Sequence, residues 1–303
     1  MRELAKSLGY VRHQAGAILS TGKTLSILFV VPYELGRFPH LFHMEVLQGL
    51  IDEVTPRGYI VNLVFEQYLR QRGETVFSVL SPARADGAVL LLVKSDESQF
   101  VGRAFSLPVV MVNQMIDGVQ ADFVVADDKQ GAYSATKHLI DLGHRSIAYL
   151  AGPPGYYATA QRLAGYRDCL LDHGLAFNEE LVASGQMDKE GGYDALTQLL
   201  GRGIPFSAVF SHRDAMALGA IAALTERGLR VPEDVAVVGF DDDVFAELVS
   251  PSLTTVRKPR MLMGSMAGRI LLQRIEGTQP DGPVVSPLRS QLVIRQSSGG
   301  PRS

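Results

Sequence analysis

The sequence predicts an α/β protein of two lobes, each a small doubly wound parallel sheet. Apolar, β-prone runs alternate along the chain with amphipathic stretches of helical length. This alternation is typical of right-handed strand–helix–strand crossovers, which build parallel sheets with helices on both faces. Roughly eight such runs exceed what one small sheet holds, and the connections change character around residues 114–128. We therefore expect two sheets rather than one.

The first half of the chain is predicted to form strand–helix units. Residues 25–31 are a continuous β-prone run that ends at Pro32, which suits a buried parallel strand. Apolar residues then recur at helical spacing over 42–54, and the segment 56–58, Pro-Arg-Gly, ends that helix. Further strands are expected over 59–65, 86–93 and 107–113, with short helices over 74–84 and 96–105 between them.

The same alternation continues in the second half. We expect helices over 129–142, 159–173, 192–200, 215–227 and 259–275, and strands over 146–151, 207–210 and 234–240. Glycine ends four of these helices, as is common at helix C-termini: Gly143, Gly174, Gly228 and Gly277. Residues 298–303 are expected to form a loose tail.

Composition describes an ordinary folded protein. The 303 residues are 46% hydrophobic and 20% charged, which excludes a disordered or fibrous chain. No apolar run reaches the roughly 18 residues of a membrane span, and residues 1–24 lack the layout of a signal peptide. A single cysteine, Cys169, excludes an internal disulfide framework. These observations predict a cytoplasmic protein with no membrane partner.

The charge is divided unevenly. Residues 1–24 hold four basic residues against one acidic residue, a net charge of +3, so the remainder carries −6 of the total of −3. A basic arm on an acidic body indicates an anionic partner such as nucleic acid. Four cations also fit a solvated tail, and charge alone does not separate the two interpretations.

Motifs of enzymes are missing from the sequence. It contains no G-x-S-x-G nucleophile elbow, no G-x-x-x-x-G-K-[ST] phosphate loop and no G-x-G-x-x-G after the first strand. His40 with His43, and the run Asp241-Asp-Asp243, lack further ligands at a useful spacing for a metal. Cys169 is expected to be a buried, inert thiol. We therefore predict no enzyme activity, no catalytic residue, no metal site and no cofactor.

Polar residues follow several of the predicted strands. Asn113 ends the strand over 107–113, Asp127 follows a Val-Val-Ala run, and Arg213 with Asp214 follows the strand over 207–210. Asp241 directly follows the strand over 234–240. In parallel-sheet folds such positions converge on a ligand cleft, where carboxylate and guanidinium groups bind ligand hydroxyls. The aspartates could instead cap helices or be solvated in loops.

Several segments resemble the core of LacI/GalR-type transcriptional repressors. The stretch 214–256 is the most specific of them. The segments follow in order along nearly the whole chain: residues 127–133, 138–145, 162–166, 214–219, 228–235, 238–242, 253–256 and 292–295. The resemblance implies a two-lobed, periplasmic-binding-protein-like fold of type I, used as a homodimer. It implies an N-terminal lobe of 25–125 plus about 260–287 and a C-terminal lobe of 126–256 plus about 288–297, with crossings near 125–127, 257–260 and 285–290.

The N-terminus resembles the family's link between its DNA-binding headpiece and its core. Residues 1–24 look like the end of a headpiece followed by a hinge helix over 13–19. Leu19 matches the leucine that wedges into the minor groove, with Arg12 and Gln14 as further DNA-binding candidates. The helix-turn-helix itself does not occur in this sequence, so weak or no operator binding is expected of the chain as given. A truncated sequence is the first explanation and a headpiece-free regulator the second.

The resemblance also implies a set of ligand-binding residues: Phe42, Asn113, Asp127, Arg162, Arg213 and Asp241, with His40 as an additional candidate. The implied function is a ligand-responsive repressor that couples a sugar-like effector, bound between the lobes, to DNA binding. Arg213 stands where the family often has Asn, which indicates an acidic or phosphorylated effector or an ion pair with a neighbouring Asp; we favour the ion pair. Two alternatives remain, a solute receptor of the same fold and a sugar-modifying enzyme.

Overall fold

The computed structural model describes residues 23–32, 41–91 and 100–299 of the chain. It divides into two compact units, unit 1 of Met1–Val124 with Arg260–Val285 and unit 2 of Val125–Pro259 with Ser286–Ser303. The chain therefore passes between the units three times. Four of the residues singled out in the sequence, Arg12, Gln14, Leu19 and His40, lie outside the described residues.

Unit 1 is built around a parallel sheet, as predicted. The strands are β1 (Ser26–Val31), β2 (Ile60–Phe65), β3 (Gly87–Leu90), β4 (Val109–Val112), β5 (Asp122–Ala126) and β11 (Val285–Leu288), in the spatial order β11-β5-β4-β3-β1-β2. The pairs from β2 through β5 are all parallel. Every residue of β1, β3, β4 and β5 is buried. This burial explains why these strands are apolar apart from Ser26 and Asp122 at the starts of β1 and β5.

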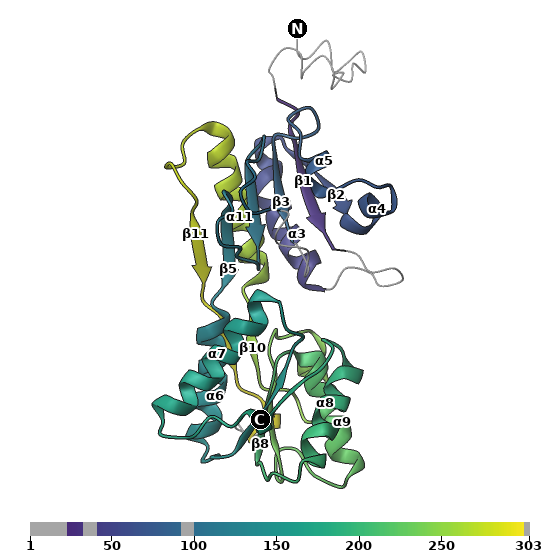
Figure 1. Cartoon of the computed structure of the whole chain (residues 1–303), viewed down its shortest axis with the longest axis vertical. Coiled ribbons are helices and arrows are strands. Elements are labelled where there is room, and N and C mark those ends of the chain that lie inside the picture. Colours follow the sequence, from purple (N-terminus) through teal and green to yellow (C-terminus); the bar gives the residue numbers. More distant parts are fainter. Residues whose placement is uncertain (1–22, 33–40, 92–99, 300–303) are drawn as a thin grey trace. The chain divides into compact units, whose positions relative to one another are not determined.

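Two long helices cover this sheet. Helices α3 (Leu41–Val54) and α11 (Arg260–Glu276) contact each other, and α11 also contacts β3 and β4 (Figure 1). The two short helices α4 (Glu66–Gln71) and α5 (Val76–Val79) contribute Leu69, Val76 and Val79 to a core cluster with Leu28 and Val30 of β1. A short 3-10 helix, η1 (Thr55–Arg57), follows α3.

Unit 2 has the doubly wound arrangement in its simplest form. Its strands β6 (Ile147–Ala151), β7 (Val182–Ser184), β8 (Ala208–Ser211) and β9 (Ala236–Val238) form a parallel sheet in the order β7-β6-β8-β9. Helices α6 (Asp128–Asp141) and α7 (Tyr157–Asp172) lie on one face, and α8 (Lys189–Gly201) and α9 (Asp214–Glu226) on the other (Figure 1). Each face has its own apolar cluster.

Smaller elements complete unit 2. The strands β10 (Thr255–Arg257) and β12 (Gln291–Val293) form an antiparallel pair. The short helices are α10 (Phe245–Leu248), η3 (Glu179–Leu181) and η4 (Gln296–Ser298).

Three expectations about local structure were wrong. The described part of the predicted helix 96–105, residues 100–105, forms turns and loop, and the helix over 74–84 shrinks to the single turn of α5. Ser298, assigned to a loose tail, is only 2% exposed and its hydroxyl bonds Thr254 Oγ1 at 2.7 Å. The ordered chain thus continues beyond the predicted start of the tail. No helix in the described parts of the chain is long and apolar enough to span a membrane.

Candidate functional site

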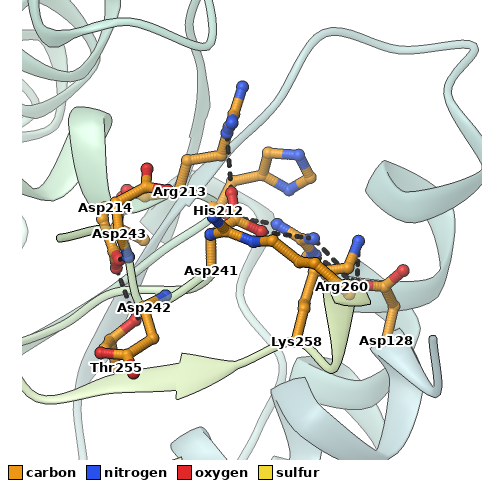
Figure 2. A network of polar contacts seen from close by, with 12 residues as sticks. Asp128, His212, Arg213, Asp214, Asp241, Asp242, Asp243, Thr255, Lys258 and Arg260 are labelled. Carbon is orange, nitrogen blue, oxygen red and sulfur yellow. Dashed lines mark hydrogen bonds and ion pairs between the residues drawn. The ribbon is translucent and has the colours of Figure 1, made fainter. Parts of the chain in front are cut away.

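A network of charged side chains lies past the carboxyl ends of β8 and β9 in unit 2. We call it the polar cluster and define it as Asp128, Arg162, His212, Arg213, Asp214, Asp241 and Lys258. Figure 2 labels every member except Arg162. The ends of parallel strands are where α/β folds of this kind bind ligands. The structure thus brings together three of the predicted ligand-binding residues, Arg162, Arg213 and Asp241.

Arg162 is the buried centre of the polar cluster. Its guanidinium donates from Nε to Asp128 Oδ1 at 2.9 Å and from Nη2 to Asp241 Oδ1 at 3.4 Å, and Nη1 donates to the carbonyl oxygen of His212. The group also lies 3.7 Å above the ring of Phe240. Burial alone lowers the pKa of Arg162, but Asp128 and Asp241 outweigh it and the net shift is upward. A side chain that is 3% exposed and bonded on several sides acts as a cross-link between elements.

Asp241 sits on a strained turn after β9. Its φ is +113° and that of Asp242 is +54°, both in a region that non-glycine residues rarely adopt. Each such residue costs on the order of 1–3 kcal/mol unless its surroundings fix it. Asp242 is fixed by Arg257 Nε at 2.5 Å and Arg295 Nη2 at 2.7 Å. Such strain is often found at ligand sites, and here it directs the Asp241 carboxylate toward both arginines.

Asp214 stabilises this turn through two hydrogen bonds. One carboxylate oxygen accepts from Thr255 Oγ1 at 2.5 Å and the other from the backbone N–H of Asp243 at 2.8 Å. Burial, followed by the nearby charge of Asp241, raises the pKa of Asp214 well above its ordinary value. A Cβ on Gly239 would lie 2.2 Å from Asp214 Oδ1, so a larger residue there would displace this carboxylate. Asp214 is therefore a positioning residue of the turn, not a helix cap.

Arg213 joins the cluster through one bond. Its Nε donates to Asp241 Oδ2 at 2.8 Å, which confirms the predicted ion pair with a neighbouring aspartate. Among the residues that the structure describes, this is the only hydrogen bond of its guanidinium. The side chain is 15% exposed, against 3% for that of Arg162.

Three members of the cluster were not predicted from the sequence. Asp128 and His212 each stand one residue away from a predicted site residue, and Lys258 follows β10. Lys258 Nζ lies 3.7 Å from Asp128 Oδ1. Burial lowers the pKa of His212 well below its ordinary value, and Arg162 lowers it further, so the imidazole is neutral at pH 7. Their positions after strand ends could have marked these residues as site candidates. That signal does not tell which of two adjacent side chains points into the polar cluster.

The other predicted residues lie elsewhere. Asp127 is the N-cap of α6, where its carboxylate accepts from the backbone N–H of Gln130 at 3.0 Å, as one interpretation of the sequence allowed. Asn113, with φ +62°, follows β4, and the half-buried Phe42 lies on α3; both belong to unit 1. The part of these two residues in binding stays a prediction.

Two features bear on the chemistry available. Cys169 is buried, and burial raises its pKa to about 12, so its thiol stays protonated at neutral pH even with His173 Nδ1 at 3.8 Å from Sγ. Within the described ranges no three His, Cys, Asp or Glu side chains gather as a metal site would require. What the polar cluster offers is an array of hydrogen-bond donors and acceptors suited to binding.

Comparison with known proteins identifies relatives over the whole chain. Residues 136–298 match the family described as periplasmic binding protein-like domain. The chain is 34% identical to the HTH-type transcriptional regulator CelR of Thermobifida fusca, over 98% of this chain and 88% of that protein. It is 30% identical to the probable HTH-type transcriptional repressor ExuR of Bacillus subtilis, over 97% and 87%. With GalR of Escherichia coli the identity is 38%, over 63% and 56%.

Solved structures agree with this assignment. A complex of the transcriptional regulator CelR with cellobiose superposes with a TM-score of 0.82 at 33% identity, over 98% of this chain and 89% of that one. A sugar-binding regulator of the LacI family from Escherichia coli, complexed with phosphate, gives 0.76 at 30% identity, over 92% and 100%. The predicted fold class is thereby confirmed. This chain belongs to the LacI/GalR family of transcriptional regulators, with the periplasmic-binding-protein-like fold of that family.

Proposed function

We propose that this protein is a transcriptional repressor whose core binds a small, sugar-like effector at the polar cluster and couples that binding to operator DNA. Its similarity to regulators along nearly the whole chain supports the regulatory role. The cellobiose held by the CelR structure supports a sugar-like effector. The observation that carries the proposal is the polar cluster itself, because charged groups converge on the strand ends where this fold binds ligands.

Within this proposal the predicted ligand residues take different roles. Arg213 and Asp241 contact the effector, and Arg162 holds Asp241 in place from the buried side. Asp127, at the first turn of α6, is available to a ligand hydroxyl through its remaining lone pairs. Phe42 and Asn113 of unit 1, and His40, are further candidates. Substitution of Asp127, Phe42, Asn113 or His40, followed by measurement of effector affinity, tests each of these roles.

The proposal also covers the partners. The protein acts as a cytoplasmic homodimer without a catalytic step or cofactor, and the hinge candidates Leu19, Arg12 and Gln14 contribute part of its DNA contacts. The regulator names of the relatives support this assignment. Effector binding acts by shifting the populations of two conformations that differ in DNA affinity. A tenfold change in DNA affinity requires only about 1.4 kcal/mol of differential effector binding.

Transcript profiling of a strain that lacks the gene tests this function. We expect a small set of transcripts to rise, and to fall again when the gene is restored. A gene with Asp241→Asn should restore repression but no longer respond to the sugar that relieves it. A gene with Asp194→Asn, on the exposed surface of α8, should behave as the parent. Unchanged transcripts on every carbon source would contradict a regulatory function.

A further inference from the structure

The two arginines of the polar cluster differ in how many donors they have left. Arg162 uses its guanidinium on Asp128, Asp241 and the carbonyl of His212, and the group stacks on an aromatic ring. Arg213 uses only Nε toward the described residues, so both terminal nitrogens, with four N–H bonds, have no acceptor there. The available donors of the cluster are therefore concentrated on one partly exposed side chain.

A purely structural role does not account for this arrangement. Asp241 Oδ1 already accepts from Arg162, so Asp241 keeps one cationic partner in the cluster without Arg213. Guanidinium and carboxylate groups frequently form a paired fork of two parallel N–H···O bonds. Arg213 instead bonds Asp241 through Nε, and its terminal nitrogens Nη1 and Nη2 bond none of the described residues.

Several cationic side chains lie near His212, the residue before Arg213 in the chain. Arg162, Arg213 and Lys258 all act to lower the pKa of this buried imidazole, and Asp241 opposes them. The loop before α7 passes the same ring, because a Cβ on Gly152 would lie 2.7 Å from His212 Nε2 and 2.9 Å from Thr159 Oγ1. That loop leads to a helix N-terminus, the positive end of a helix dipole.

The start of α7 adds a second observation. This 16-residue helix begins with neither a capping side chain nor an acidic residue in its first turn. Thr159 stands in that turn and is 7% exposed, and its buried Oγ1 has no hydrogen-bond partner among the described residues. Helix N-termini without internal compensation favour anions. Two sources of positive potential, the terminal nitrogens of Arg213 and the start of α7, therefore lie near His212.

We propose that the effector carries an anionic group, a carboxylate or a phosphate, which the terminal nitrogens of Arg213 bind as a paired fork beside the start of α7. This inference rests on the proposed function and names the chemical class of its effector. A guanidinium fork matches the two oxygens of a carboxylate or phosphate better than it matches a single hydroxyl, and the charge strengthens each bond.

Calorimetric titration of the full chain with matched compounds tests the inference. The panel contains neutral hexoses and disaccharides, the uronate of each hexose, the 6-phosphate of each hexose, and inorganic phosphate. We expect a uronate or a sugar phosphate to bind at least about tenfold more tightly than its neutral parent, and its affinity to fall as salt rises. Which acidic series binds identifies the anionic group; binding of inorganic phosphate alone would contradict a sugar-like effector.

Substitution of Arg213 separates recognition of the anionic group from binding of the rest of the effector. Arg213→Gln should weaken binding of the acidic compound at least about tenfold more than it weakens binding of the neutral parent. Arg213→Lys keeps the charge without the fork and should give an intermediate loss. Arg230→Gln, at an exposed ion pair, is the matched control and should bind as the parent.

The outcomes distinguish two failures. If a neutral sugar binds as tightly as its acidic counterpart, or Arg213→Gln loses both equally, the anionic effector is wrong and the proposed function stands. If no compound of the panel binds, both are contradicted. Should Arg213→Gln fail to fold, the ranking of compounds and the salt dependence of the parent still decide the question.

Discussion

Arg162 and Arg213 show how two like side chains can have different roles within one cluster. Arg162 is enclosed and bonded to both Asp128 and Asp241, whereas Arg213 touches Asp241 from the partly exposed side. Removing one partner of a buried ion pair leaves an uncompensated charge, which is strongly destabilising. The two arginines therefore predict different phenotypes, one in folding and one in binding.

Arg162→Ala should lower the free energy of unfolding by about 3–5 kcal/mol. The loss arises because Asp128, which is 1% exposed, would keep only the more distant Lys258 as a charged partner in the cluster. Denaturant unfolding measures it, with Arg230→Gln as a control that should stay within about 1 kcal/mol of the parent. A fully stable Arg162→Ala protein would show that this residue is not a cross-link.

His212 predicts how stability depends on pH. Burial holds the pKa of His212 in the folded protein well below the ordinary value of 6.5. On acidification the imidazole therefore becomes protonated in the unfolded chain while it stays neutral in the folded chain. Stability should therefore fall between about pH 7.5 and about pH 5.5, with about 1 kcal/mol due to this residue. Asp214, whose folded pKa is raised, contributes in the opposite direction over the acidic range.

Comparison with His212→Gln isolates this effect, because the contribution of Asp214 is common to both proteins. The loss of unfolding free energy on going from about pH 7.5 to about pH 5.5 should be smaller in the variant by about 1 kcal/mol. Equal losses in the two proteins would mean that the imidazole titrates normally in the folded state.

At the residue scale, the sequence was a better guide to which residues lie close together than to the role of each residue. The strand-end rule located Arg213 and Asp241, and the ion pair between them was expected. It did not distinguish Asp127 from Asp128, since adjacent residues at a helix start point in different directions and one caps α6 while the other enters the cluster. The positive φ of Asp241 and the role of Asp214 depend on contacts between distant segments, which no local pattern contains.

Among the elements, glycines decide how closely helices pack. In unit 1 a Cβ on Gly49 of α3 would lie 1.9 Å from the carbonyl oxygen of Met261, and one on Gly264 of α11 would lie 1.9 Å from that of Val46. The same reciprocal arrangement joins α8 and α9, through Gly192 and Gly219. Side chains at these positions would push the helix backbones apart.

Gly264→Ala should therefore destabilise the protein by about 2 kcal/mol or more through overpacking. A Cβ on Gly201, in the last turn of α8, would meet no atom within 4 Å, so this position provides a matched control. Gly201→Ala should be neutral or slightly stabilising, by up to about 1 kcal/mol, because alanine is the better helix former. Thermal or denaturant unfolding of both variants checks this; equal effects would show that α3 and α11 can separate without loss.

Asp127 allows capping and effector binding to be separated. Asp127→Ala should lower stability by about 1 kcal/mol, since the N–H of Gln130 loses its acceptor, whereas Asp127→Asn retains a good cap. If the carboxylate also binds effector, Asn should lose affinity at unchanged stability. Unfolding and titration of the two variants measure both effects, and an equally stable alanine variant would argue against the cap.

The accuracy of the predicted elements follows from their length and burial. The long helices α6, α7, α9 and α11 were located to within about two residues, as expected for strongly periodic segments. The strands β7, β10 and β12 have three residues each and, unlike the equally short β9, do not lie within a longer apolar run, so no pattern marks them. The phenylalanines of residues 100–105 do not mark a helix: Phe100 belongs to the core cluster of unit 1 and Phe105 packs against it, both from a loop.

For the whole molecule, the chain returns twice to units that it has already left. Residues 260–285 complete unit 1 and residues from 286 onward complete unit 2, and each unit has buried clusters of its own. Two parallel sheets could be predicted from the sequence because most of their strands are buried runs that carry their own apolar signal. The identity of the effector could not, since it depends on which donors remain unbonded after folding.

Calorimetric titration of the full chain tests most directly whether the polar cluster of unit 2 is the effector site of a regulator. We predict that the tightest compound of the panel binds with one site per chain, and that Asp241→Asn weakens it at least about tenfold while the control Asp194→Asn does not. Thermal unfolding without ligand should show that both variants remain folded. A folded Asp241→Asn protein that binds the same compound with unchanged affinity would contradict the assignment of this cluster as the effector site.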